Sequence, residues 1–153
     1  ESFSAAAAGY ASQNNAVDAA EMRNNQSVAL LQAGDAQAAY DAAAGTGQIF
    51  ETAGDAKRQA MALGNMAAAL DELGRLQEAE DAYQKSAKLF TEIGEDKLHA
   101  NVMQSISKLQ LRSGRQLEAI ASMQSGLEEI KKPSIKQKLL KKLLKSPFKL
   151  LDR

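Results

Sequence analysis

The 153-residue chain contains no cysteine and no tryptophan, and it has only two prolines. Without cysteine it can form neither a disulfide framework nor a thiolate zinc site, and redox chemistry excludes no compartment. No segment approaches the roughly 18 consecutive apolar residues of a membrane span, and the N-terminus lacks the layout of a signal peptide. We therefore expect a cytoplasmic protein. The start at Glu1 without Met predicts a segment of a longer or processed chain.

Signals for a β-sheet are also missing. No Asn-Gly or Asp-Gly pair separates apolar stretches, and no β-branched run alternates with polar residues. Aromatic residues make up only 5% of the chain, so the core must be built from Ala, Leu, Met and Ile in closely packed helices. We predict an all-α fold.

The net charge of zero hides an asymmetry between the two ends. Residues 1–130 contain 10 Lys and Arg against 18 Asp and Glu, a net charge of −8. Residues 131–153 contain nine basic residues against Asp152 alone, a net charge of +8. The acidic body and the basic end must therefore be considered separately.

A period of 40 residues organises the chain. Glycines recur at Gly34, Gly74 and Gly114, each followed five residues later by an alanine, at Ala39, Ala79 and Ala119. A second register with the same period holds Tyr10, Phe50, Phe90 and Ile130. Apolar residues between these points recur at helical spacing. The pattern predicts helices near 2–12, 16–33, 36–52, 56–73, 76–93, 96–113, 116–131 and 134–145.

Each part of the period has a mechanical role. Gly suits the left-handed residue that commonly follows a helix end. The alanines, together with Ser27, Ala67 and Ser107 in the preceding helices, allow close helix crossing. Each period is therefore predicted to be a helical hairpin. A helical bundle with coincidental spacing is the alternative to a stacked array of such hairpins.

The second and third periods share a longer set of matching residues. The second holds Leu63, Met66, Ala67, Leu70, Gly74, Ala79, Tyr83 and Ser86, and the third holds Met103, Ile106, Ser107, Gly114, Ala119, Met123 and Gly126. This spacing resembles that of the tetratricopeptide repeat family, in the long form found in kinesin light chains and spindle-orientation scaffolds. The resemblance covers roughly residues 14–132. It implies a right-handed superhelical solenoid of antiparallel helix pairs.

The predicted domain organisation follows from the repeats. Residues 1–132 form a repeat domain of three repeats with an N-terminal flanking helix, and residues 133–153 form a capping helix and tail.

The first repeat departs from the family pattern at Arg23, Gln26, Ala43 and Thr46. Gly45 and Gly47 also fall inside its second helix, where each Gly costs on the order of 1 kcal/mol relative to Ala. We therefore expect a loose or kinked first repeat.

The resemblance also implies a concave groove, lined by the first helix of each pair, that binds a peptide or helix of a partner protein. Matched by position, the groove residues are Asn24, Asn25, Val28 and Gln32, then Met61, Asn65, Ala68 and Glu72, then Asn101, Gln104, Lys108 and Arg112. Their amides could pair with an extended peptide backbone. A solvated helix face is the alternative interpretation of these residues.

The basic end contains a strongly amphipathic segment after Pro133. Ile135, Leu139, Leu140, Leu143 and Leu144 share one face, and lysines cover the rest. We expect this helix to cap the last repeat. Contact with an anionic membrane surface or an acidic partner is a second interpretation, and the tail around Phe148 could dock into another copy and form oligomers. Few aromatic residues accompany the basic ones, so nucleic acid is not an expected partner.

Catalytic and metal-binding patterns are lacking. His99 is the only histidine, and the adjacent acidic pairs such as Asp71-Glu72 point about 100° apart on a helix. No phosphate-binding glycine loop or nucleophile motif is present. We predict a scaffold for protein–protein interaction that is not an enzyme and holds no metal or cofactor. The alternative function is self-assembly through the amphipathic tail, with an anionic membrane surface as one place for it.

Overall fold

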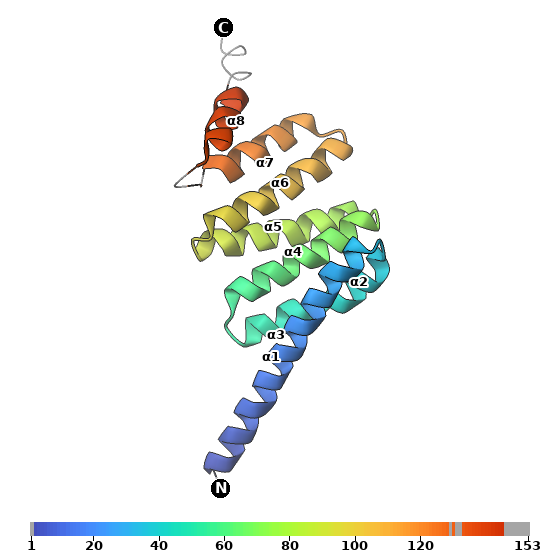
Figure 1. Cartoon of the computed structure of the whole chain (residues 1–153), viewed down its shortest axis with the longest axis vertical. Helices are drawn as coiled ribbons and strands as arrows, with labels where there is room; N and C mark the ends of the chain where they lie inside the picture. Colours follow the sequence, from blue (N-terminus) through green and yellow to red (C-terminus); the bar gives the residue numbers. More distant parts are fainter. Residues whose placement is uncertain (1, 129, 131–132, 146–153) are drawn as a thin grey trace. The chain divides into compact units, whose positions relative to one another are not determined.

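The computed structural model describes residues 2–128, 130 and 133–145, and every regular element in this part of the chain is an α-helix (Figure 1). The chain forms two compact units, residues 1–89 and 90–153. The first unit contains α1 (Ser2–Gln32), α2 (Ala36–Ala43), α3 (Thr46–Thr52), α4 (Ala56–Glu72) and most of α5 (Leu76–Glu92). The second contains α6 (Asp96–Arg112), α7 (Gln116–Glu128) and α8 (Ile135–Lys145).

Helices that follow one another in the chain pack as hairpins in both units. In the first unit α1 packs against α2 and α3, and α4 packs against all three. The Ser86 hydroxyl of α5 donates to the Ala60 carbonyl of α4 at 2.7 Å, which joins the second hairpin. In the second unit α6 pairs with α7, and α8 packs against α7 (Figure 1). The predicted all-α architecture of stacked helix pairs is confirmed. The predicted domain boundary after residue 132 lies beside residues outside the described part and stays a prediction.

The turns between helices use the predicted glycines. Gly74 has a φ of +75°, and Gly34 and Gly114 lie in the same left-handed region. The Gly74 N–H donates to the Asp71 carbonyl, and the Arg75 N–H reaches back to the Leu70 carbonyl at 2.9 Å. This pair of bonds is a Schellman motif, which satisfies carbonyls that the end of a helix leaves unpaired. Each turn therefore ends one helix within three residues and lets the next begin.

Small residues lie where the two helices of a hairpin cross. Ala39, Ala79 and Ala119 are at most 1% exposed, as are Ser27, Ala67 and Ser107 in the preceding helices. In the third hairpin the two positions meet directly, because the Ser107 hydroxyl donates to the Ala119 carbonyl at 2.8 Å. The predicted close crossing is thus confirmed.

The large residues of the second register fill the space that the small ones leave. Phe50 is fully buried, and Phe90 and Ile130 are at most 7% exposed. Phe50 of α3 forms one cluster with Ala20 of α1 and Ala62 of α4. It therefore packs the first hairpin against the helix that begins the second.

The first repeat is broken, as its glycines predicted. Gly45 has a φ of +78°, and it separates α2 from α3 within the predicted helix 36–52. The break frees backbone carbonyls, and two side chains satisfy them. The Arg23 guanidinium of α1 donates to the carbonyls of Asp41 and Ala44, the latter at 2.7 Å, and the buried Thr46 hydroxyl donates to the Ala43 carbonyl. Arg23 and Thr46, which departed from the family pattern, compensate the break.

The prediction of two separate helices, 2–12 and 16–33, is wrong, because α1 is one continuous helix of 31 residues. The gap was inferred because Asn14 stands 40 residues before Gly54 and 80 before Gly94, both of which lie between helices, and Asn14 is part of the polar run Gln13-Asn14-Asn15. This run contains neither Pro nor Gly, and Asn costs less than 1 kcal/mol in a helix interior. Alanines on both sides of it favour continuation. The N-terminal flanking helix is therefore the first part of the first repeat's own helix.

The close crossing of α6 and α7 can be tested at Gly126. A Cβ atom added there would lie 2.8 Å from the Met103 Cβ and 3.3 Å from the Ala100 Cα. We expect Gly126→Ala to lower the free energy of unfolding by about 1–2 kcal/mol, because overpacking outweighs the gain in helix propensity. Urea unfolding followed by circular dichroism measures the change.

Gly64→Ala is the matched control for this substitution. Its added Cβ would meet only the Ser86 hydroxyl, at 3.4 Å, within the 4 Å contact range. We expect the control to leave stability unchanged or to raise it by less than about 1 kcal/mol. Equal effects of the two substitutions would contradict a close crossing at Gly126.

Candidate interaction surface

The predicted groove residues lie on the first helix of each pair. In the first unit Asn25, Gln32 and Glu72 are exposed, Val28 and Met61 are 38% and 41% exposed, and Asn65 and Ala68 are half-buried. In the second unit Asn101, Gln104, Lys108 and Arg112 are exposed along α6. Most of the predicted positions can therefore be reached from solvent. Their assignment as a peptide-binding site stays a prediction.

Asn24 differs from the other predicted residues because it is only 5% exposed. Its side-chain oxygen accepts a hydrogen bond from the Asn65 amide at 3.0 Å. The pair joins α1 to α4, so Asn24 contacts the next repeat and positions Asn65. The Asn65 side-chain oxygen is not used in this bond and can accept a hydrogen bond from a peptide N–H.

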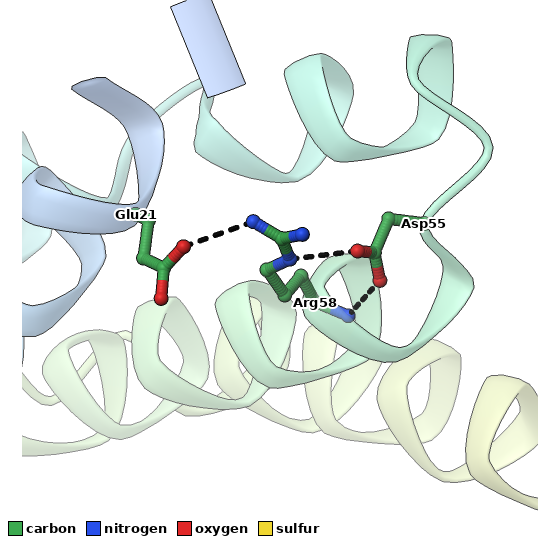
Figure 2. A network of polar contacts seen from close by, with 3 residues as sticks. All are labelled: Glu21, Asp55 and Arg58. Atoms are coloured by element: carbon green, nitrogen blue, oxygen red, sulfur yellow. Dashed lines mark hydrogen bonds and ion pairs between the residues drawn. The ribbon is translucent and has the colours of Figure 1, made fainter. Parts of the chain in front are cut away.

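A second polar network joins the same two helices beside this pair. Figure 2 shows Arg58 of α4 between Glu21 of α1 and Asp55, the residue that caps α4. Its guanidinium lies 2.9 Å from a Glu21 oxygen and 2.6 Å from an Asp55 oxygen, and it also lies over the Phe50 ring. Arg58 thereby ties the start of α4 to the preceding repeat.

The charge of Asp55 is stabilised by the residue that it caps. The Arg58 backbone N–H donates to the Asp55 carboxylate at 2.9 Å and is the main cause of a lowered pKa for Asp55. Partial burial opposes this shift, and the Arg58 guanidinium adds to it. The positive N-terminal end of α4 also favours the charged carboxylate. Asp55 is therefore ionised at neutral pH and serves structure rather than proton transfer.

A pocket of about 130 Å³ adjoins the predicted surface in the second unit. It is lined by residues of α6, α7 and α8, namely Ala100, Asn101, Gln104, Met123, Gly126, Leu127, Gln137 and Leu140. Two predicted groove residues, Asn101 and Gln104, thus line a cavity together with apolar side chains of α7 and α8. The Gln124 amide donates to the Leu144 carbonyl at 3.0 Å, which helps hold α8 beside this pocket.

Sequence reasoning missed Gln137 and Leu140 as part of this surface. The repeat register contained the signal, because α4 begins at Ala56, α6 at Asp96 and α8 at Ile135, almost a full period later each time. α8 therefore stands in the register of a first helix. The sequence had predicted a cap or a contact with a membrane or an acidic partner, but not a place in the repeat register.

The first unit has a larger pocket lined by two second helices and one first helix. Its volume is about 240 Å³, and α2, α4 and α5 line it with Tyr40, Leu63, Met66, Leu70, Glu78, Asp81, Ala82 and Lys85. The Arg75 guanidinium lies 4.8 Å from the centre of the Tyr40 ring and forms an ion pair with Glu78. The groove prediction did not include this surface, because it considered other positions of α4 and none of α2 or α5.

Across residues 15–128, 130 and 133–144, no group of three or more His, Asp or Glu side chains is arranged to hold a metal ion. His99, the only histidine of the chain, is 4% exposed. In the same described part of the chain, no helix is both long enough and apolar enough to cross a membrane. The surface can offer hydrogen bonds, charges and small apolar pockets.

Comparison with known proteins supports the repeat interpretation. Residues 58–128, slightly less than half of the chain, match the family model for the tetratricopeptide repeat. Such repeats generally mediate protein–protein interaction and scaffolding. The match covers α6, α7 and most of the second hairpin and omits the broken first repeat. No curated protein matches the chain. The likeness to the long-repeat subgroup stays a prediction.

The capping role of Asp55 can be tested with two substitutions. Asp55→Ala should lower the free energy of unfolding by about 1 kcal/mol, because it removes the helix cap and the ion pair. Asp55→Asn keeps an oxygen that can accept from the Arg58 N–H, so it should cost only about half as much. Urea unfolding at several pH values measures both effects.

The pH dependence provides the control for this experiment. A lowered pKa stabilises the folded chain above the ordinary aspartate pKa, and this contribution is lost as pH falls through the folded-state pKa. The stability difference between the unsubstituted chain and Asp55→Asn should therefore shrink between about pH 5 and about pH 3. A difference that stays constant over this range would contradict an ionised, stabilised Asp55.

Proposed function

We propose that this chain, with its tetratricopeptide repeat match, is an interaction scaffold that binds an extended peptide segment of a partner protein along its first helices. The observation that supports this most strongly is the row of exposed polar side chains on α6 beside the pocket, Asn101, Gln104, Lys108 and Arg112. These residues recur every three or four positions, so they share one helix face. Polar side chains beside a pocket that large apolar residues help to line are a common arrangement for ligand binding.

The α6 surface suggests what the peptide must contain. Met123, Leu127 and Leu140 are the large apolar side chains that line the pocket, and its volume of about 130 Å³ suits one apolar side chain of modest size. The Asn101 and Gln104 amides at the pocket can pair with the peptide backbone on both sides of that residue. We therefore expect one apolar anchor residue, fixed by hydrogen bonds to the backbone around it.

The charge of α6 adds a second requirement for the peptide. Lys108 lies one helical turn beyond Gln104, a rise of about 6 Å, and Arg112 lies one turn further, at about 12 Å. An extended peptide covers these distances in roughly two to four residues. An acidic residue at that distance from the apolar anchor would lie beside the two cations. At the corresponding position in the second repeat stands Glu72, so we expect the acidic group of the peptide to favour α6 over α4.

Self-assembly through the basic end remains the second candidate function. It is favoured by the exposed apolar side chains of α8, where Leu139 and Leu143 are each 60% exposed. The tail around Phe148, predicted to dock into another copy, lies outside the described residues. Sedimentation velocity over a wide concentration range separates the two functions. A self-assembling chain gains mass with concentration, whereas a peptide-binding scaffold keeps its mass until a ligand is added.

Peptide selection tests the proposal without knowledge of the partner. Peptides are selected on the full chain from a random library displayed on phage, and the affinities of the selected peptides are measured by fluorescence anisotropy. We expect enriched peptides to carry an apolar residue with an acidic residue two to four positions away. Gln104→Ala combined with Lys108→Ala should weaken their binding about tenfold or more, because two polar contacts are lost.

A matched pair of residues on α5 supplies the control. Gln84 and Lys85 are exposed residues of the same two types on a second helix. Gln84→Ala combined with Lys85→Ala should leave peptide affinity unchanged. Selected peptides that lose affinity equally in both double variants, or in neither, would remove the α6 face as the binding site.

A further inference from the structure

The outer face of α8 carries a stripe of apolar side chains that nothing in the described structure covers. Ile135, Leu139 and Leu143 are 86%, 60% and 60% exposed, and their spacing of four residues aligns them along one side of the helix. Gln137 and Leu140 lie at the pocket that α8 shares with α6 and α7. α8 is thus attached to its unit by one face and presents a second apolar face to solvent.

Lysines border this stripe along its length. Lys136, Lys138 and Lys142 are exposed on α8. The sequence from residue 131 to 145 contains seven lysines and no acidic residue. An apolar stripe framed by exposed lysines is the pattern of a helix that lies in the interface of an anionic membrane. The long lysine stems can reach lipid phosphates while the leucines enter the acyl boundary.

We propose that α8 is a membrane-surface helix that binds anionic lipid bilayers through Ile135, Leu139 and Leu143 and the lysines beside them. The chain would lie on the bilayer rather than span it. The side of α8 that lines the pocket would stay in contact with α7, so the unit would keep its fold on the membrane. This inference goes beyond the proposed peptide scaffold and does not depend on it.

Two observations favour a lipid surface over a second copy of the chain. Symmetric pairing of two α8 helices would bring their lysines together, and neither helix carries an acidic residue to offset the repulsion. The stripe consists of only three side chains over a helical rise of about 12 Å. The area that these side chains can bury is therefore far smaller than the roughly 800 Å² that each partner buries in a stable protein interface. Membrane binding needs no minimum area, because each inserted apolar side chain and each lysine near the lipid adds its own contribution to the binding free energy.

Charge complementarity makes anionic lipid the preferred surface. The basic end has a net charge of +8, whereas residues 1–130 have a net charge of −8. An anionic bilayer attracts the first and repels the second, so contact should be confined to the basic end. The attraction acts over about 10 Å at 0.1 M salt and about 3 Å at 1 M salt. Binding should therefore weaken strongly as salt is raised.

Vesicle flotation of the full chain tests this proposal. One set of vesicles contains phosphatidylcholine alone, and a second set contains about 30% phosphatidylserine as the anionic lipid. At about 0.1 M salt we expect the bound fraction to be at least about fivefold higher on the anionic set, and the excess should disappear near 1 M salt. The double variant Leu139→Ser and Leu143→Ser keeps every charge and should lose at least about tenfold in vesicle affinity.

Control substitutions outside α8 separate the effect of the stripe from the effect of any exposed leucine or lysine. Leu117→Ser removes a leucine that is 73% exposed on α7, and it should leave vesicle binding unchanged. Lys138→Glu combined with Lys142→Glu should abolish the preference for anionic vesicles, whereas Lys97→Glu, at an exposed lysine of α6, should reduce it only slightly. Circular dichroism of each variant verifies that the helices are intact.

Several outcomes would overturn the proposal. Absence of binding to both vesicle sets would do so, as would equal binding by the unsubstituted chain and the Leu139→Ser, Leu143→Ser variant. If the chain ignores vesicles but gains mass with concentration, and the leucine variant loses that gain, the stripe is an interface between copies. The Gln104→Ala, Lys108→Ala variant should bind vesicles normally, so failure of peptide recognition and failure of membrane contact can be told apart.

Discussion

Close approach of paired helices at small residues is the constraint on which the other features of this chain depend. A side chain larger than Ala or Ser at Ala39, Ala79 or Ala119 would push apart helices that cross at these fully buried points. Because the helices touch there, the hydroxyl of Ser107 can bond directly to the backbone of the partner helix. The close crossing also leaves the large residues of the second register to fill the space between neighbouring hairpins, as Phe50 does in the first unit.

The sequence predicted those features that depend on local backbone chemistry. A left-handed residue after a helix end nearly requires glycine, so a glycine every 40 residues marks the turns whatever surrounds them. The break at Gly45 was predictable for the same reason. The gap expected around Asn14 was wrong because polar residues without Gly or Pro weaken a helix only slightly. Helix ends need a positive stop signal, and that run contains none.

Features that depend on tertiary neighbours could not be predicted in the same way. Asn24 and Asn25 look alike in sequence, yet only Asn24 faces α4 and is buried against Asn65. Arg23 looked like a defect in the repeat, and its role emerged only once the carbonyls freed at Gly45 were placed beside it. On α8 the leucine pattern predicted one covered face, whereas the structure divides it between a packed edge and an exposed one. Sequence periodicity identifies the apolar face of a helix, but it does not show which element packs against that face.

The position of Arg58 has a consequence for how the first unit opens. One guanidinium holds the cap of α4 and also bonds to Glu21 on α1, so the first turn of α4 cannot fray without releasing its link to the preceding helix. Local opening in this part of the chain should therefore involve both segments together, and their amide protons should exchange as one cooperative group. A ligand resting on α1 and α4 would slow exchange in both helices at once. The first helices of the unit would thus respond to a ligand as one continuous surface.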